Sequence, residues 1–214
     1  MIFDLDGVLI HSMPMHTEAW KQYLAAMGLH YDDIESRMHG KRNSELVRDL
    51  IDPTLADDVV FEHGAAKERL FRELLLKGDL EQYRIPGLQA FLDRRPDIPK
   101  AVGTNAEPAN LEFVLERFGL SHYFQATVNG SQVQHPKPFP DIYLKAAELL
   151  KMKPEDCIVF EDSPTGVAAG LAAGMRVVGI ETTPTTFQGV SLQVPDFTDP
   201  RLDAWLDAEL SAAQ

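Results

Sequence analysis

The hydrophobic positions of the chain follow two different periods, one before residue 85 and one after it. Between residues 12 and 83, apolar side chains recur every three to four positions, as they do on one face of an α-helix. Helices are predicted over residues 12–28, from about residue 43 to Pro53, and over residues 54–77. Because no strand pattern interrupts this stretch, we expect residues 12–84 to form one all-helical unit.

From residue 85 onward, short apolar runs alternate with helical segments, a pattern typical of βαβ units. Strands are predicted at 101–104, 126–128, 157–160 and 176–180, and helices at 107–118, 141–150 and 164–173. The stretch 195–210 is expected to hold a short strand and a terminal helix. The chain also opens with an apolar run, Ile2-Phe3, which has no strand partner before residue 85. The pattern therefore predicts an α/β core, a doubly wound (Rossmann-like) parallel sheet over residues 1–11 and 85–214, with residues 12–84 inserted.

Composition narrows the class of protein. The 33 acidic residues outnumber the 20 basic ones, and the net charge of −13 argues against a nucleic-acid or anionic-membrane partner. No apolar run approaches the ~18 residues of a membrane span, and Asp4 and Asp6 interrupt the opening run where a signal peptide would continue. A single cysteine, Cys157, excludes an internal disulfide framework. We therefore expect a soluble, cytoplasmic protein.

Polar side chains gather where the predicted parallel strands end. In open α/β sheets, ligands bind beyond the carboxyl ends of the strands. Those ends and the loops after them carry four acids, one hydroxyl, one amide and one lysine: Asp4, Asp6, Thr104, Asn105, Lys137, Glu161 and Asp162. Unit charges ~4 Å apart repel by roughly 4 kcal/mol at an effective dielectric of ~20, and Lys137 supplies only one compensating charge.

An all-oxygen site that is short of cations suits a hard divalent ion, and Mg²⁺ is the cofactor that we expect. Asp4, Asp162 and the backbone carbonyl of Asp6 are the predicted ligands, and Glu161 is a further candidate ligand. A metal beside a carboxylate, a lysine and a hydroxyl can gather and polarise a phosphate group.

These groups can divide the work of phosphoryl transfer. Asp4 would attack phosphorus and form an aspartyl phosphate. Asp6 would act first as an acid toward the leaving alcohol and then as a base toward the incoming nucleophile. Lys137 would keep Asp4 ionised and neutralise a phosphate oxygen, while Thr104 and the amide of Asn105 would bind another.

Four motifs in this order carry a family resemblance: Asp4-Leu5-Asp6-Gly7-Val8, Gly103-Thr104-Asn105, Lys137-Pro138, and Glu161-Asp162-Ser163-Pro164-Thr165-Gly166. The whole chain resembles the haloacid dehalogenase-like (HAD) phosphotransferase superfamily, and is most similar to its β-phosphoglucomutase-like branch of sugar phosphatases and mutases. The resemblance implies that residues 12–84 are a helical cap domain that closes over the site, that the Lys137–Pro138 bond is cis, and that the protein is a monomer. The namesake dehalogenases lack the second aspartate, so Asp6 favours phosphoryl transfer over dehalogenation.

The resemblance leaves two reactions of a sugar phosphate as alternatives: hydrolysis, and the mutase reaction that moves the phosphate within the sugar. A mutase must hold the second phosphate of a bisphosphate intermediate. In β-phosphoglucomutases an arginine follows the cap-loop glycine by three positions, but the residue three positions after Gly40 is Asn43. Lys41 and Arg42 lie close to that position without matching it. Glu107 places an acid where the mutases have a lysine that binds phosphate.

One cap residue supports the mutase alternative, because His16 matches the cap histidine of the mutases. On balance we predict an Mg²⁺-dependent phosphatase whose partner is a small phosphomonoester, a sugar phosphate. The alternatives are a β-phosphoglucomutase-type mutase and a catalytically silent binding module. The predicted substrate contacts of the cap are His16, Lys41, Arg42 and Asn43.

Overall fold

The structure, a computed structural model, describes residues 1–38, 41–182 and 185–212. The chain divides into two compact units, which we call the sheet unit (Met1–His11 with Glu81–Gln214) and the helical unit (Ser12–Leu80). The helical unit ends four residues before the expected boundary at residue 84. The reason is that Arg84 forms an antiparallel bridge with Ile10, and the backbone N–H of Ile85 donates to the carbonyl of Leu9. Residues 81–84 therefore pack with the sheet unit.

The sheet unit contains one six-stranded sheet in the order β3-β2-β1-β4-β5-β6, in which all neighbouring strands are parallel. The predicted doubly wound parallel sheet is confirmed. The short last strand lies before Pro195 and not after it as we expected, because it pairs with Val178–Ile180 and a proline has no N–H to continue the ladder. The strands are β1 (Ile2–Phe3), β2 (Ala101–Thr104), β3 (Ala126–Asn129), β4 (Ile158–Glu161), β5 (Arg176–Ile180) and β6 (Leu192–Val194).

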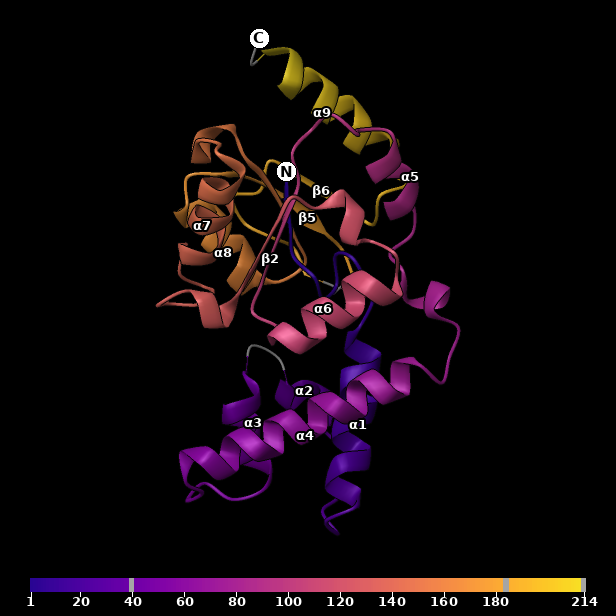
Figure 1. Cartoon of the computed structure of the whole chain (residues 1–214), viewed down its shortest axis with the longest axis vertical. Coiled ribbons are helices and arrows are strands. Elements are labelled where there is room, and N and C mark those ends of the chain that lie inside the picture. The colour runs from indigo at the N-terminus through magenta and orange to yellow at the C-terminus, as the bar shows by residue number, and fades with distance from the viewer. Residues whose placement is uncertain (39–40, 183–184, 213–214) are drawn as a thin grey trace. The chain divides into compact units, whose positions relative to one another are not determined.

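Helices connect the strands and cover the sheet (Figure 1). The helix predicted at 107–118 begins at Pro108, and the one predicted at 164–173 ends at Ala172, so both match within a residue. The helices of this unit are α5 (Leu88–Asp93), α6 (Pro108–Arg117), α7 (Asp141–Leu150), α8 (Pro164–Ala172) and α9 (Pro200–Ala212). Four short 3-10 turns join them: η1 (Leu80–Tyr83), η2 (Ser121–Tyr123), η3 (Gly130–Gln132) and η4 (Pro154–Asp156).

The two faces of the sheet carry different cores, because successive side chains of a strand point to opposite faces. On one face, Ile2 and Val159 pack in an apolar cluster with Tyr143 of α7 and residues of α8. On the other face, Phe3 stacks on Phe160 with ring centroids 4.6 Å apart, and both rings contact Phe91 of α5. The alternation places Asp4 and Glu161, the next positions in register with Ile2 and Val159, on the α7 face.

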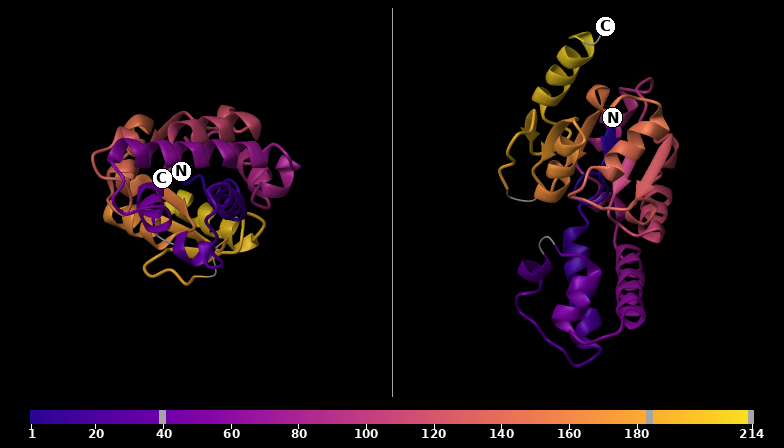
Figure 2. Two further views of the ribbon diagram at one scale, coloured as in Figure 1. Left: turned by 90° about the horizontal axis from the view of Figure 1, so that it is seen from below. Right: turned by 90° about the vertical axis from the view of Figure 1, so that its left-hand side faces the viewer.

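The helical unit contains α1 (Met13–Ala25), α2 (Ile34–Met38), α3 (Asn43–Leu50) and α4 (Asp57–Leu75). Helix α4 packs beside α1 and also contacts α3, and α1 contacts α2 (Figure 2). The buried core of this unit comprises Trp20, Leu24, Ile34, Met38, Leu46, Val47, Leu50 and Val60. No helix in the described part of the chain is both long enough and apolar enough to span a membrane.

Candidate active site

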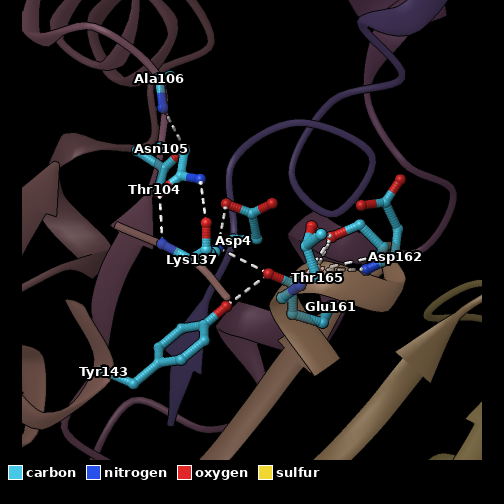
Figure 3. Close-up of polar contacts among 11 residues, drawn as sticks. Asp4, Thr104, Asn105, Ala106, Lys137, Tyr143, Glu161, Asp162 and Thr165 are labelled. Atoms are coloured by element: carbon cyan, nitrogen blue, oxygen red, sulfur yellow. Dashed lines mark hydrogen bonds and ion pairs between the residues drawn. The ribbon is translucent and has the colours of Figure 1, made fainter. Parts of the chain in front are cut away.

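The carboxyl ends of β1, β2 and β4 bring the predicted site residues together (Figure 3). Asp4 follows β1, Thr104 ends β2, and Glu161 ends β4 with Asp162 directly after it. Lys137 reaches the same place from the loop between β3 and α7. These five side chains are all buried, with exposed fractions of 8% or less.

Lys137 lies between two of the carboxylates. Its ammonium group is 2.9 Å from Asp4 Oδ1 and 2.6 Å from Glu161 Oε1. Burial lowers the pKa of Lys137, but the charges of Asp4 and Glu161 outweigh it, and the net result is a raised pKa. Lys137 is therefore a fixed positive charge beside Asp4.

Both oxygens of Glu161 are already used by hydrogen-bond donors. Oε1 accepts from Lys137 Nζ and from the Tyr143 hydroxyl, each at 2.6 Å. Oε2 accepts from the backbone N–H of Asp162 at 3.0 Å, and from the N–H and hydroxyl of Ser163 at 3.1 and 3.0 Å. Ser163 also caps α8, because its hydroxyl oxygen accepts from the N–H of Gly166 at 3.1 Å. The carboxylate thus lies against the start of α8, where the helix dipole favours negative charge.

Two glycines leave the space that these carboxylates occupy. A Cβ on Gly166 would lie 1.7 Å from Glu161 Oε1, and one on Gly7 would lie 1.8 Å from Asp162 Oδ2. Gly7 also has a φ of +73°, which residues with a side chain rarely adopt. The glycines of the first and fourth motifs therefore have a steric cause.

Asn105 holds the backbone of Lys137 through its side chain. Its Oδ1 accepts from the Lys137 N–H at 3.1 Å, and its Nδ2 donates to the Lys137 carbonyl at 3.4 Å. The peptide bond between Lys137 and Pro138 is cis, as the resemblance implied. Next to Asn105, the hydroxyl oxygen of Thr104 accepts from the N–H of Ala106 at 3.0 Å, so the hydroxyl proton of Thr104 is left to donate to a ligand.

The carboxyl groups are crowded enough to resist ionisation. Burial raises the pKa of Asp4 to about 7, with further contributions from Glu161 and Asp6 and opposition from Lys137. Burial, Glu161 and Asp4 raise the pKa of Asp162 well above its usual range, against a lowering by a hydrogen bond from Thr182. The negative charge of this site thus exceeds what Lys137 compensates.

The donor set fits a hard cation. Asp4, Glu161 and Asp162 each offer a carboxylate oxygen, and these atoms lie within 4.8 Å of one another. Asp4 Oδ1 is buried and forms an ion pair with Lys137 Nζ at 2.9 Å. Because Glu161 already receives five hydrogen bonds, Asp4 and Asp162 have more capacity to bind a metal than Glu161 has.

Two of the predicted substrate contacts, Lys41 and Asn43, use their side chains within the helical unit, and Arg42 uses its backbone N–H there. Lys41 Nζ lies 2.8 Å from Asp49 Oδ2, so an acid neutralises its charge. Asn43 Nδ2 donates to Glu68 Oε1 at 2.6 Å. The N–H of Arg42 donates to Glu45 Oε2 at 2.8 Å, at the start of α3. Gly40, the glycine from which the position of Asn43 was counted, lies outside the described residues.

His16 belongs to a buried polar cluster inside the helical unit. Its ring stacks on Phe71 with centroids 3.8 Å apart, and its Nδ1 is 2.8 Å from Lys67 Nζ. Lys67 in turn donates to Glu68 Oε1 at 2.9 Å. Lys67 and Glu68 are 1% and 4% exposed, so the buried face of α4 includes an adjacent pair of opposite charges.

Sequence patterns did not predict that Tyr143, Thr182, Lys67 and Glu68 belong to polar clusters. Tyr143 and Thr182 are uncharged and lie outside the four motifs. Lys67 and Glu68 are adjacent charged residues, which on a helix usually face solvent. The spacing could have indicated the burial of Lys67, which lies four residues before Phe71, on the same face of α4.

The chain is similar to several known proteins in sequence and in structure. The profile of the haloacid dehalogenase-like hydrolase family matches residues 1–174. Fructose-1-phosphate phosphatase YqaB of Escherichia coli K12 is 34% identical over 183 residues, which cover 84% of this chain and 95% of that protein. A β-phosphoglucomutase of Mycobacterium bovis is 30% identical over 223 residues, covering 90% and 84% of the two chains. A crystal structure of a HAD hydrolase, family IA, variant 3, from Entamoeba histolytica matches with a TM-score of 0.86 and 25% identity, covering 97% of each chain.

The first prediction concerns Tyr143, whose hydroxyl supports Glu161. Tyr143→Phe removes a buried hydrogen bond to a charged acceptor, so the free energy of unfolding should fall by about 1.5–3 kcal/mol. Denaturant titration measures this change. Tyr123→Phe is the matched control, because it removes a hydroxyl that donates to Asp93 outside the site, and its cost should stay below about 1 kcal/mol. Equal losses in the two variants would contradict the special role of Tyr143.

The second prediction concerns pH. In the metal-free protein the pKa of Asp4 is raised from 3.8 to about 7, so its contribution to stability is lost as pH rises through this range. A divalent cation that binds Asp4 must displace its proton, so below pH ~7 the affinity for the cation falls about tenfold per pH unit. Mg²⁺ should therefore raise the melting temperature more at pH ~8 than at pH ~5.5. An equal or larger rise at the lower pH would contradict this assignment, and Asp162→Asn should abolish the effect.

Proposed function

The chain belongs to the haloacid dehalogenase-like hydrolase family, as the four motifs predicted, and we propose that it is an Mg²⁺-dependent phosphatase of a small sugar phosphate. Its membership and its phosphatase relatives make it a phosphomonoester hydrolase. The observation that carries the finer proposal is the buried Asp4 held beside Lys137. A carboxylate in that position can attack phosphorus and form a covalent intermediate.

The proposed reaction has two steps at Asp4. First, a carboxylate oxygen of Asp4 forms a bond to phosphorus while the bond from phosphorus to the sugar oxygen breaks, and Asp6 gives its proton to that oxygen. Second, Asp6 accepts a proton from water as the water oxygen forms a bond to phosphorus and the bond from phosphorus to the Asp4 oxygen breaks. Inorganic phosphate leaves, and the carboxylate of Asp4 and the acid form of Asp6 are restored.

The other residues of the site position the phosphate and balance its charge. Lys137 offers its ammonium protons to a phosphate oxygen while it stays paired with Glu161. Thr104 donates its hydroxyl proton to a second oxygen, together with the N–H of Asn105. We assign the Asn105 side chain to holding the Lys137 backbone, and Glu161 to holding the Lys137 ammonium group.

Mg²⁺ is the proposed cofactor. Asp4, Asp162 and the backbone carbonyl of Asp6 would hold it, because the carboxylates of Asp4 and Asp162 lie close together and Glu161 already receives five hydrogen bonds. When bound, Mg²⁺ supplies positive charge that lowers the repulsion between the carboxylates and the phosphate.

The charges of the chain favour hydrolysis over the mutase reaction. A mutase needs free positive charge for a second phosphate, but Lys41 is paired with Asp49, and Glu107 adds an acid just before α6. We also assign the helical unit the role of a cap that excludes water, with His16 among its substrate contacts. Because the relative that is 34% identical is named a fructose-1-phosphate phosphatase, fructose 1-phosphate is the first substrate to test.

A panel of sugar phosphates assayed for phosphate release tests the function. We expect release from at least one sugar phosphate in the presence of Mg²⁺, none with excess chelator, and none from the Asp4→Asn variant, because an amide cannot act as the nucleophile. Asp32→Asn, an exposed position outside the site, is the matched control and should keep full activity.

Two outcomes would contradict this function. Conversion of β-glucose 1-phosphate to glucose 6-phosphate, stimulated by a bisphosphate primer and without phosphate release, would establish the mutase instead. A lack of any turnover across sugar phosphates, with and without primer, would favour a binding module.

A further inference from the structure

A single hydroxyl group, that of Thr182, bridges two groups beside the proposed metal site. Thr182 Oγ1 lies 2.8 Å from the carbonyl oxygen of Gly7 and 3.0 Å from Asp162 Oδ2. Gly7, Asp162 and Thr182 belong to the segments that follow β1, β4 and β5, which are adjacent in the sheet order. Thr182 therefore connects three neighbouring strand ends at one point.

The chemistry of this contact favours the carboxylate as the acceptor. The hydroxyl has one proton, whereas the Gly7 carbonyl and the Asp162 carboxylate both accept. A hydrogen bond to an ionised oxygen is roughly twice as strong as one to a neutral oxygen. An ionised Asp162 thus takes the proton, and the Gly7 carbonyl stays close enough to share it.

Two observations locate the side chain of Asp162. Its backbone N–H is fixed by Glu161 Oε2 at 3.0 Å, but that bond does not set the direction of the carboxylate. Oδ2 lies directly over Gly7, where only the absence of a Cβ gives it room. The bond from Thr182 to this same oxygen, at 3.0 Å, restrains the direction of the carboxylate.

We propose that Thr182 is a positioning residue, whose hydroxyl fixes the carboxylate of Asp162 in the orientation that binds the divalent cation. The inference rests on the proposed function, because it assumes that Asp162 is a metal ligand. Mutation of a group that orients a metal ligand typically weakens metal affinity by roughly 10- to 100-fold. Thr182 does not touch the substrate phosphate in this account and acts only through Asp162.

Metal affinity, measured without substrate, is the test. Mn²⁺ binding is followed by electron paramagnetic resonance, and Mg²⁺ affinity is obtained by competition. Thr182→Val keeps the shape of the side chain and removes the hydroxyl, so we expect affinity about 10- to 100-fold weaker. Thr182→Ser keeps the hydroxyl and should bind within about threefold of the wild type. At saturating Mg²⁺, the KM for substrate should change less than about twofold in both variants, since the substrate contacts are intact.

The outcomes separate the hydroxyl from a merely structural role. Affinity unchanged in Thr182→Val, or weakened equally in the Val and Ser variants, would overturn the proposal. If Thr182→Val does not fold, as judged by its melting curve, Thr182→Ala replaces it with the same expectation. Failure of the proposed function has a different signature: wild-type protein that binds Mn²⁺ but releases phosphate from no sugar phosphate. Wild-type protein that binds no divalent ion would overturn both.

Discussion

The ion pair between Lys137 and Glu161 is the interaction on which the rest of the site depends. Both side chains are almost fully buried, and removing either partner would leave the other charge uncompensated, at a typical cost of about 3–5 kcal/mol. Several neighbours hold this pair in place: Tyr143 of α7 and the two residues just before α8 donate to Glu161, while Asn105 fixes the backbone of Lys137. Asp4 lies against this pair, so its charge and its position are set by groups that are themselves held in place.

The parallel sheet explains why residues so distant in sequence can meet. All six strands point the same way, so the segments that follow β1, β2, β4 and β5 gather at one edge. The alternation of side chains then selects the face: Asp4 and Glu161 lie on the side of α7, within reach of Lys137 and Tyr143. Gly7 and Gly166 complete the arrangement, because a side chain at either position would occupy the place of a carboxylate oxygen.

Much of this arrangement could be predicted from sequence, for a definite reason. Asp4 and Asp162 are charged residues directly after apolar strands, and in a parallel sheet such residues lie at the carboxyl ends of the strands, where ligands bind. Tyr143 and Thr182 could not be predicted, because their roles depend on which way a side chain points across two packed layers. The pair Lys67 and Glu68 was missed because burial of charge depends on partners in other helices, among them Asn43. Strand β6 was predicted too late in the chain, because three residues give too short a hydrophobic pattern to locate a strand.

The central claim is that Asp4 carries the phosphoryl group during turnover. The most direct measurement is a rapid acid quench of the protein with a sugar phosphate that it hydrolyses, radiolabelled in the phosphate. We expect transient label on the protein, released by hydroxylamine as the label of an acyl phosphate is, and mapped to the peptide that contains Asp4. Phosphate release with no labelled protein at any time, or label on a different residue, would contradict it.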